Sequence, residues 1–329
     1  MAGDADVHLL ADGSLHLEAG AEKDRTGHES CPRRRQDRYP SAFAAESTVC
    51  VMSVSLRATR LSDIGAGLRL CRACQWNQVE DDWRCFLDFD GAGGHLALRD
   101  DLVLGTVAFL RYGRAFSWIA MMLVDPQARR TGIASLLMDA ALESLKEGDR
   151  IRLDATPAGE PLYRHYGFLD EYPLLRTKIA VAEETFVPSR RNVRRMVAAD
   201  LPKVFARDRV IFGADRSALL ASFYRRAPEL AWVTTDGYCF GRPGYLYSQL
   251  GPIVAGDVET ARDLVSHCLS SQHGKRFAID VPEHSPDWIR WMESAGFEIE
   301  RPFLRMCRGD NPGYGLPDRQ FGIGGPEFA

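Results

Sequence analysis

The feature that most constrains the fold of this chain is a change of hydrophobic period between residues 116 and 145. Residues 116–124 are almost continuously apolar, as in a strand buried on both faces, and Asp125 and Pro126 end that run. Apolar residues then recur at helical spacing, at Ile133, Leu136, Leu137, Ala140, Ala141 and Leu145. The sequence therefore predicts a buried strand, a short turn and an amphipathic helix.

The turn between this strand and this helix suits a phosphate group. The first amides of a helix have no partner within the helix, and the helix dipole adds positive charge there. Gly132 has no side chain, so a ligand can approach the backbone closely, and Arg129 and Arg130 supply guanidinium groups. On these residues alone, an ordinary strand-to-helix connection with surface arginines remains the alternative.

The full motif is more specific than its arginine and glycine. It reads Val124-x-Pro126-x-x-Arg129-Arg130-x-Gly132-Ile133-Ala134. It resembles the pyrophosphate-binding motif of the GNAT superfamily of acyl-CoA N-acyltransferases, in which Arg/Gln-x-x-Gly-x-Gly/Ala is matched here by Arg129, Gly132 and Ala134. The sequence has neither a P-loop nor a dinucleotide fingerprint. The resemblance implies that acetyl-CoA is held by Met122, Leu123, Val124, Arg129, Arg130, Thr131, Gly132, Ile133 and Ala134.

A second signature follows at the expected distance. Residues 162–168 read LYRHYGF and are similar to the Tyr-x-x-x-Gly-Phe signature of the same superfamily. Many relatives place this tyrosine near the leaving sulfur as a general acid, which makes Tyr163 the catalytic candidate, with Tyr166 as the alternative. A phenol of pKa about 10 can protonate a thiolate of pKa about 8.5 given a good hydrogen bond. A packing role for Tyr163 in an amphipathic helix is the other interpretation.

The order of predicted elements in residues 52–187 recurs more weakly in residues 188–308. We therefore expect an α+β (α/β) fold of two GNAT-like domains, each a mixed, mostly antiparallel twisted sheet flanked by helices. The second domain has no arginine before Gly256, carries Asp257 beside it, and lacks a tyrosine before Gly296-Phe297. It is predicted to be degenerate, walling the acceptor cleft or stabilising the first domain. A tail, residues 309–329, has apolar residues that can dock, Phe321, Ile323 and Phe328.

The acceptor side is less clearly marked in the sequence. The resemblance places the acceptor cleft between the first two helices, so Trp76, Asn77 and Gln78 are the candidate acceptor contacts; a helix junction with Trp76 in the core is an equal alternative. The general base is unresolved. Glu80, Asp81 and Asp82 lie in this region, but we expect them on a solvated helix face, and Asp125 is expected to cap a turn.

Composition excludes several other classes of protein. The net charge of −4 and the lack of a basic stripe argue against nucleic acid, and no apolar run has membrane-spanning length. The eight cysteines are few and irregularly spaced, so reduced thiols are expected, and Cys71 and Cys74 lack the second ligand pair of a zinc site. We expect a cytoplasmic protein without a metal. Residues 1–51 are predicted to be a disordered extension, with Met52 as an alternative start.

The resulting functional prediction is an N-acetyltransferase. It would transfer the acetyl group of acetyl-CoA directly to a primary amine of a small molecule or a protein. Two alternatives remain open, a transferase that uses a longer acyl-CoA and a non-catalytic acyl-CoA sensor. The resemblance does not choose the acceptor, and it also allows a homodimer.

Overall fold

A computed structural model of the protein describes residues 54–145, 149–181, 186–187, 192–310 and 313–329. The extension expected at residues 1–51, Met52 and most of the predicted domain junction lie outside these residues. The strands are β1 (Ser55–Ala58), β2 (Ala92–Arg99), β3 (Leu102–Tyr112), β4 (Phe116–Val124), β5 (Ile151–Ala155), β6 (Leu169–Ala180), β7 (Arg194–Arg195), β8 (Trp232–Thr234), β9 (Gly237–Arg242), β10 (Ser248–Ala255), β11 (Arg276–Pro282), β12 (Glu298–Arg308) and β13 (Gln320–Gly322). The helices are α1 (Ile64–Ala73), α2 (Glu80–Asp88), α3 (Ile133–Ser144), α4 (Glu160–His165), α5 (Leu201–Phe212), α6 (Ser217–Arg226), α7 (Val258–Leu269) and α8 (Pro286–Ser294).

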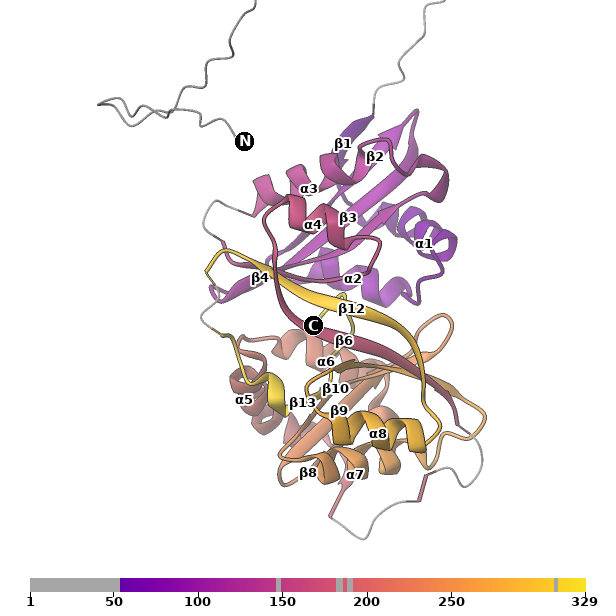
Figure 1. The fold of residues 1–329 in the computed structure, drawn as a ribbon, viewed down its shortest axis with the longest axis vertical. Helices are drawn as coiled ribbons and strands as arrows, with labels where there is room; N and C mark the ends of the chain where they lie inside the picture. Colours follow the sequence, from indigo (N-terminus) through magenta and orange to yellow (C-terminus); the bar gives the residue numbers. More distant parts are fainter. Residues whose placement is uncertain (1–53, 146–148, 182–185, 188–191, 311–312) are drawn as a thin grey trace, which may run out of the picture. The chain divides into compact units, whose positions relative to one another are not determined.

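All these strands belong to one mixed, mostly antiparallel sheet with helices packed on it, which confirms the predicted fold class. The order is β1-β2-β3-β4-β5-β12-β6-β11-β10-β9-β8-β7, with β13 paired to β10. The last strand of each half has crossed to the other half, because β12 pairs with β5 and β6 pairs with β11 (Figure 1). The two GNAT-like halves therefore share a single sheet through exchanged strands.

Both halves use the same local devices. At the start of the first half, Asp63 binds Arg57 at 2.7 Å and accepts a hydrogen bond from the Arg60 amide. At the start of the second half, Asp200 binds Arg194 at 2.7 Å and accepts one from the Val197 amide. This repetition at equal spacing supports an internal duplication.

Three apolar cores hold the helices to the sheet. α3 and α4 pack through Leu137, Met138 and Tyr163 against the first half. α7 and α8 pack through Leu264, Trp288 and their neighbours against the second half. The third core contains side chains of α1, α2, α5 and α6 together with Phe328, so it joins the two halves.

The C-terminal segment docks into the fold along its length. Phe321, Ile323 and Phe328, the three residues expected to dock, are all buried. Phe328 stacks on Phe86 with ring centroids 5.2 Å apart, and Tyr112 Oη donates to the Phe328 carbonyl at 2.9 Å. Trp118 Nε1 donates to the carbonyl of Pro326 at 3.0 Å, so β3 and β4 hold the end of this segment.

Candidate functional site

The candidate site is an opening between β4 and β5. These parallel strands pair only at Ser117 with Ile151 and at Trp118 with Arg152, although β4 continues to Val124. Beyond that point the strands separate, and a cavity of about 860 Å³ is lined by residues 119–124 on one side and 156–159 on the other. An extended ligand can use the unpaired backbone of β4 there, because strand amides and carbonyls without a neighbour need another partner.

One end of the cavity lies at the N-terminus of α3. Gly132 is the N-cap residue, with φ of 84°, and no side chain caps the helix. The space that a Cβ atom of Gly132 would point into is open, so a bulky group can reach the first helical amides. Arg129, Arg130 and Ala134 line this end of the cavity. The arrangement fits a diphosphate, which needs amide donors, positive charge and close approach.

A β-bulge re-aims the backbone of β4 at mid-cavity. Met121 and Met122 together stand opposite the single residue Val107 of β3, and Met121 has φ of 51°. The hydroxyl of Thr106 donates to the Met121 carbonyl at 2.8 Å and fixes the bulge. Met122, Leu123 and Val124, which the resemblance names as donor-binding residues, all line the cavity.

Two of the nine predicted donor-binding residues can contribute only backbone groups, and a third uses its hydroxyl within the loop. Gly132 has no side chain, and the side chain of Ile133 is buried in the core beside α3. Thr131 Oγ1 donates to the Ala128 carbonyl at 2.7 Å. The Arg129 side chain contacts β4 and the end of α1, with Nε 3.4 Å from the Val124 carbonyl and Nη2 3.4 Å from Cys74 Sγ.

Tyr163 lies on α4 and lines the cavity. Its ring meets Phe168 edge-on at 6.0 Å, so it also packs in the core. Burial raises the pKa of Tyr163, which keeps the phenol protonated at neutral pH and makes it a weaker acid than an exposed tyrosine. Tyr166 differs, because its hydroxyl lies 2.7 Å from Asp139 Oδ1 and its ring does not line the cavity.

The three predicted acceptor contacts separate into two groups. Trp76 and Gln78 line the cavity, whereas Asn77 does not. The Asn77 amide instead bridges to the second half, donating to the Tyr247 carbonyl at 3.0 Å and accepting from the Leu246 amide at 2.7 Å. With its amide used in this way, we assign Asn77 a structural role.

The acidic residues of α2 do not reach the cavity. Glu80 and Asp81 are exposed, as expected for a solvated helix face. Asp82 does not fit that expectation, because it is fully buried and binds Arg226 at 2.9 Å and Arg242 at 3.0 Å. Asp125 caps the turn after β4, accepting from the Gln127 amide at 3.1 Å.

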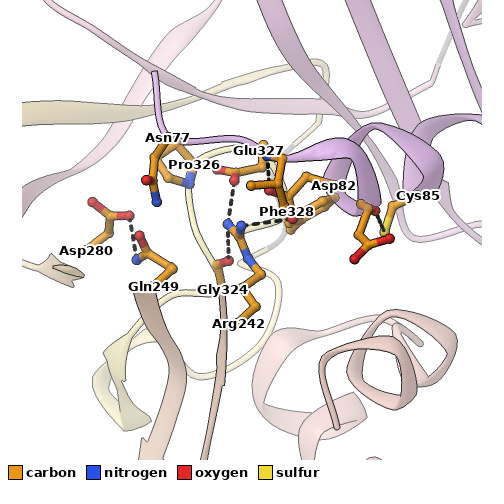
Figure 2. Close-up of polar contacts among 12 residues, drawn as sticks. Asn77, Asp82, Cys85, Arg242, Gln249, Asp280, Gly324, Pro326, Glu327 and Phe328 are labelled. Atoms are coloured by element: carbon orange, nitrogen blue, oxygen red, sulfur yellow. Dashed lines mark hydrogen bonds and ion pairs between the residues drawn. The ribbon is translucent and has the colours of Figure 1, made fainter. Parts of the chain in front are cut away.

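The cavity contains two carboxylates that the sequence reasoning missed, Asp154 and Glu327. Both carboxylate oxygens of Asp154 accept hydrogen bonds from Arg305, from Nε at 2.8 Å and from Nη2 at 2.9 Å. Glu327 comes from the C-terminal segment and is 4% exposed. Its Oε1 binds Arg242 (Figure 2). Its buried Oε2 has no hydrogen-bond partner among the described residues. The sequence signal for Glu327 was its position beside Phe328, an apolar residue that was expected to dock.

The environment of Glu327 favours the ionised form. Burial alone would raise the pKa of this carboxyl, but Arg242, Arg176, its own backbone amide and the Gln78 side chain hold it below the ordinary value. Arg242 in turn donates to the Gly324 carbonyl at 3.3 Å and contacts Asp82 (Figure 2). The carboxylate is thus fixed in place at the cavity wall.

We expect Arg242→Met to destabilise the fold by about 3–5 kcal/mol, because it would leave the buried Glu327 without its ion-pair partner and Asp82 with Arg226 alone. Denaturant titration measures the free energy of unfolding. The matched control is Arg225→Met, at an exposed position of α6. This substitution should change the free energy of unfolding by less than about 0.5 kcal/mol. Equal stability of the two variants would contradict a structural role for the Arg242 network.

The equivalent site of the second half is closed. β10 and β11 also pair only at their starts, and β10 has the same bulge, but Pro252 stands in it and has no amide to donate. The N-terminus of α7 is capped by Asp257, whose side chain accepts from the Thr260 amide at 2.7 Å. β13 then pairs with β10, and the Ile323 amide donates to the Asp280 carbonyl of β11 at 2.9 Å. The chain's own C-terminal segment therefore fills the second opening.

Other expectations concern thiols, metals and membranes. Cys71 is buried in α1, which raises its pKa to about 12, and Cys74 lines the cavity as a free thiol. In the part of the chain that the structure describes, no group of three or more His, Cys, Asp or Glu residues could hold a metal ion. No helix of that part combines the length and apolar character needed to cross a membrane.

Comparison with known proteins agrees with this geometry. Two family models, both described as an acetyltransferase (GNAT) domain, match residues 90–169 and 204–321. The chain is 26% identical over 231 residues to YitH of Bacillus subtilis (strain 168), an uncharacterized N-acetyltransferase, covering 66% of this chain and 79% of YitH.

Solved structures show the same fold. A suggested acetyltransferase of Pyrococcus horikoshii superposes with a TM-score of 0.71 at 22% identity, covering 84% of this chain and 96% of that one. A tandem GNAT protein from the clavulanic acid biosynthesis pathway gives 0.55 at 14% identity, covering 78% and 98%.

Proposed function

Because this chain belongs to the GNAT acetyltransferase superfamily, we propose that it transfers the acetyl group of acetyl-CoA to a primary amine, of a small molecule or of a protein. The observation that carries the proposal is the opening between β4 and β5, which joins an uncapped helix N-terminus, two arginines and a buried tyrosine in one cavity. We place the catalytic domain at residues 52–187 and the degenerate domain at 188–308.

In this proposal each residue has a distinct task. The amides at the start of α3 bind the diphosphate together with Arg129 and Arg130, and the bulged backbone of β4 orients the thioester. Glu327 binds the acceptor ammonium through its free oxygen and accepts its proton, directly or through a water. Tyr163 donates a proton to the leaving sulfur. The neutral amine forms the new C–N bond as the C–S bond breaks, the nitrogen returns its second proton to the Tyr163 phenolate, and the proton on Glu327 leaves to solvent. One acceptor ammonium and one thioester thus give an amide, free coenzyme A and one released proton.

Glu327 also bears on the sensor alternative. That alternative rested on the lack of an evident base in the sequence, and the cavity contains a carboxylate with a free oxygen. The enzyme is tested by measuring free thiol release from acetyl-CoA across an amine library. Tight acetyl-CoA binding without thiol release would favour the sensor.

Tyr163→Phe is expected to lower kcat about 100-fold with an unchanged Kd for acetyl-CoA, because it removes the proton donor and keeps the ring that packs on Phe168. A steady-state assay of thiol release gives kcat, and calorimetric titration with acetyl-CoA gives Kd. Tyr166→Phe on the same helix is the matched control, since its hydroxyl binds Asp139 outside the cavity. A Tyr163→Phe enzyme with full kcat would remove the acid role.

A further inference from the structure

We propose that the acceptor is an amino-carboxylate, such as a free amino acid, and that Arg301 binds its carboxylate. This inference rests on the proposed function and names the substrate class of the same site. It follows from unpartnered polar atoms of opposite character in the wall of the cavity.

Arg301 supplies the positive end. It lies on β12, lines the cavity and is half-buried, and its Nε is buried without a hydrogen-bond partner among the described residues. Its guanidinium lies over the ring of Phe303, 5.0 Å from the centroid, which fixes its position. The neighbouring acid on the strand, Glu300, binds Lys178 at 2.5 Å.

Three other buried arginines, Arg176, Arg242 and Arg305, already have a carboxylate partner. Arg176 binds Asp280 at 2.7 Å, Arg305 binds Asp154 at 2.8 Å, and Arg242 binds Glu327. Arg301 forms no such ion pair in the described part of the chain. Burial and the nearby Arg176 both lower the pKa of Arg301, and together they outweigh the opposite effect of Glu300, Tyr247 and Asp280. A guanidinium without a carboxylate partner can bind a ligand carboxylate, because its forked N–H donors match the two carboxylate oxygens.

Glu327 and Gln78 supply the end that binds the amine. Glu327 Oε2 and Gln78 Oε1 are both buried and have no hydrogen-bond partner in the described chain. Both residues line the cavity, and the Gln78 side chain is close enough to Glu327 to lower its pKa. Buried acceptor atoms without donors are costly, and an ammonium offers three N–H donors. A ligand with an ammonium and a carboxylate would satisfy all three unpartnered atoms.

The test compares amines that differ only by a carboxylate. Thiol release is measured with L-phenylalanine against phenethylamine, L-lysine against cadaverine and L-glutamate against 4-aminobutyrate, the last pair keeping one carboxylate while removing the other. The wild type is expected to favour the amino acid by at least about 10-fold in kcat/KM in one or both of the first two pairs. A preference for the plain amine in both would overturn the proposal.

Arg301→Gln tests the residue itself. It should raise KM for the preferred amino acid at least about 10-fold and leave KM for the plain amine and Kd for acetyl-CoA unchanged. Arg308→Gln, exposed on the same strand and outside the cavity, is the matched control and should change none of these values. Arg301→Glu should shift the preference from lysine toward cadaverine.

The outcomes separate this inference from the proposed function. If Arg301→Gln weakens acetyl-CoA instead of the amino acid, Arg301 serves the donor and the inference fails while acetyl transfer stands. If plain amines alone are acetylated, the acceptor class is wrong and the enzyme is right. If the wild type neither binds acetyl-CoA nor releases thiol, the proposed function itself fails.

Discussion

Replacing Glu327 with glutamine is expected to lower kcat/KM for the acceptor about 100-fold at pH 7, with little change in acetyl-CoA binding. Glutamine keeps the size of the side chain but cannot hold an ammonium or accept its proton. Glu327 is the cavity carboxylate with a free oxygen, because Asp154 is bound on both of its oxygens by Arg305. Thiol release at varied amine concentration gives the ratio.

The pH dependence distinguishes a chemical role of Glu327 from a structural one. Its depressed pKa keeps it ionised near neutrality, so the wild type can bind the ammonium form of the amine. The glutamine variant must use the neutral amine, which becomes scarcer by about 10-fold per pH unit below an amine pKa near 10. The deficit should therefore shrink from pH 7 toward pH 10. A deficit that stays constant with pH would indicate damage to the fold, and Glu298→Gln, at an exposed position, controls for charge loss.

Gly132→Glu is expected to weaken acetyl-CoA binding by about 100-fold or more. A side chain at Gly132 would point into open space at the N-terminus of α3, where the diphosphate is proposed to bind. A carboxylate there would both fill that space and bring negative charge to the helix dipole. Calorimetric titration with acetyl-CoA measures the effect, and the variant should lose thiol release in parallel.

The control for Gly132→Glu must carry the same backbone strain. Gly113, in the turn between β3 and β4, also has positive φ, 60°, and also has open space at its Cβ position. Gly113→Glu should therefore lose a similar amount of stability and retain acetyl-CoA affinity. Equal acetyl-CoA affinities of the two variants would contradict the assignment of the diphosphate site to the N-terminus of α3. The proposed function would then fail as well.

Elements with strong local patterns could be predicted from the sequence. β4 ends at Val124 and α3 begins at Ile133, as the change of period indicated. The fold class followed from the resemblance of two short signatures and of the order of elements to the GNAT superfamily. The residues that we propose bind the donor lie within one continuous stretch, residues 122–134, so they could be proposed from the sequence.

Features that depend on distant pairings could not be predicted in this way. No local pattern predicts that β6 and β12 each pair with strands of the other half, because an apolar strand could pair at the edge of either half. Glu327 reaches the cavity only because β13, which precedes it, lies between β10 and β11. The Asn77 amide donates to the carbonyl of Tyr247, 170 residues away in the sequence. Asp82 looked solvated because its neighbours Glu80 and Asp81 are, yet its partners Arg226 and Arg242 come from the other half.

The exchange of β6 and β12 explains why the second half persists. Without β12 the sheet of the first half would end at β5, and β11 would lose β6 if the halves were separated. Neither copy can be discarded by a deletion, even though one of them has no open donor cleft. The second half of the sequence thus completes the sheet of the first and supplies Arg301 and Glu327 to the wall of its cavity.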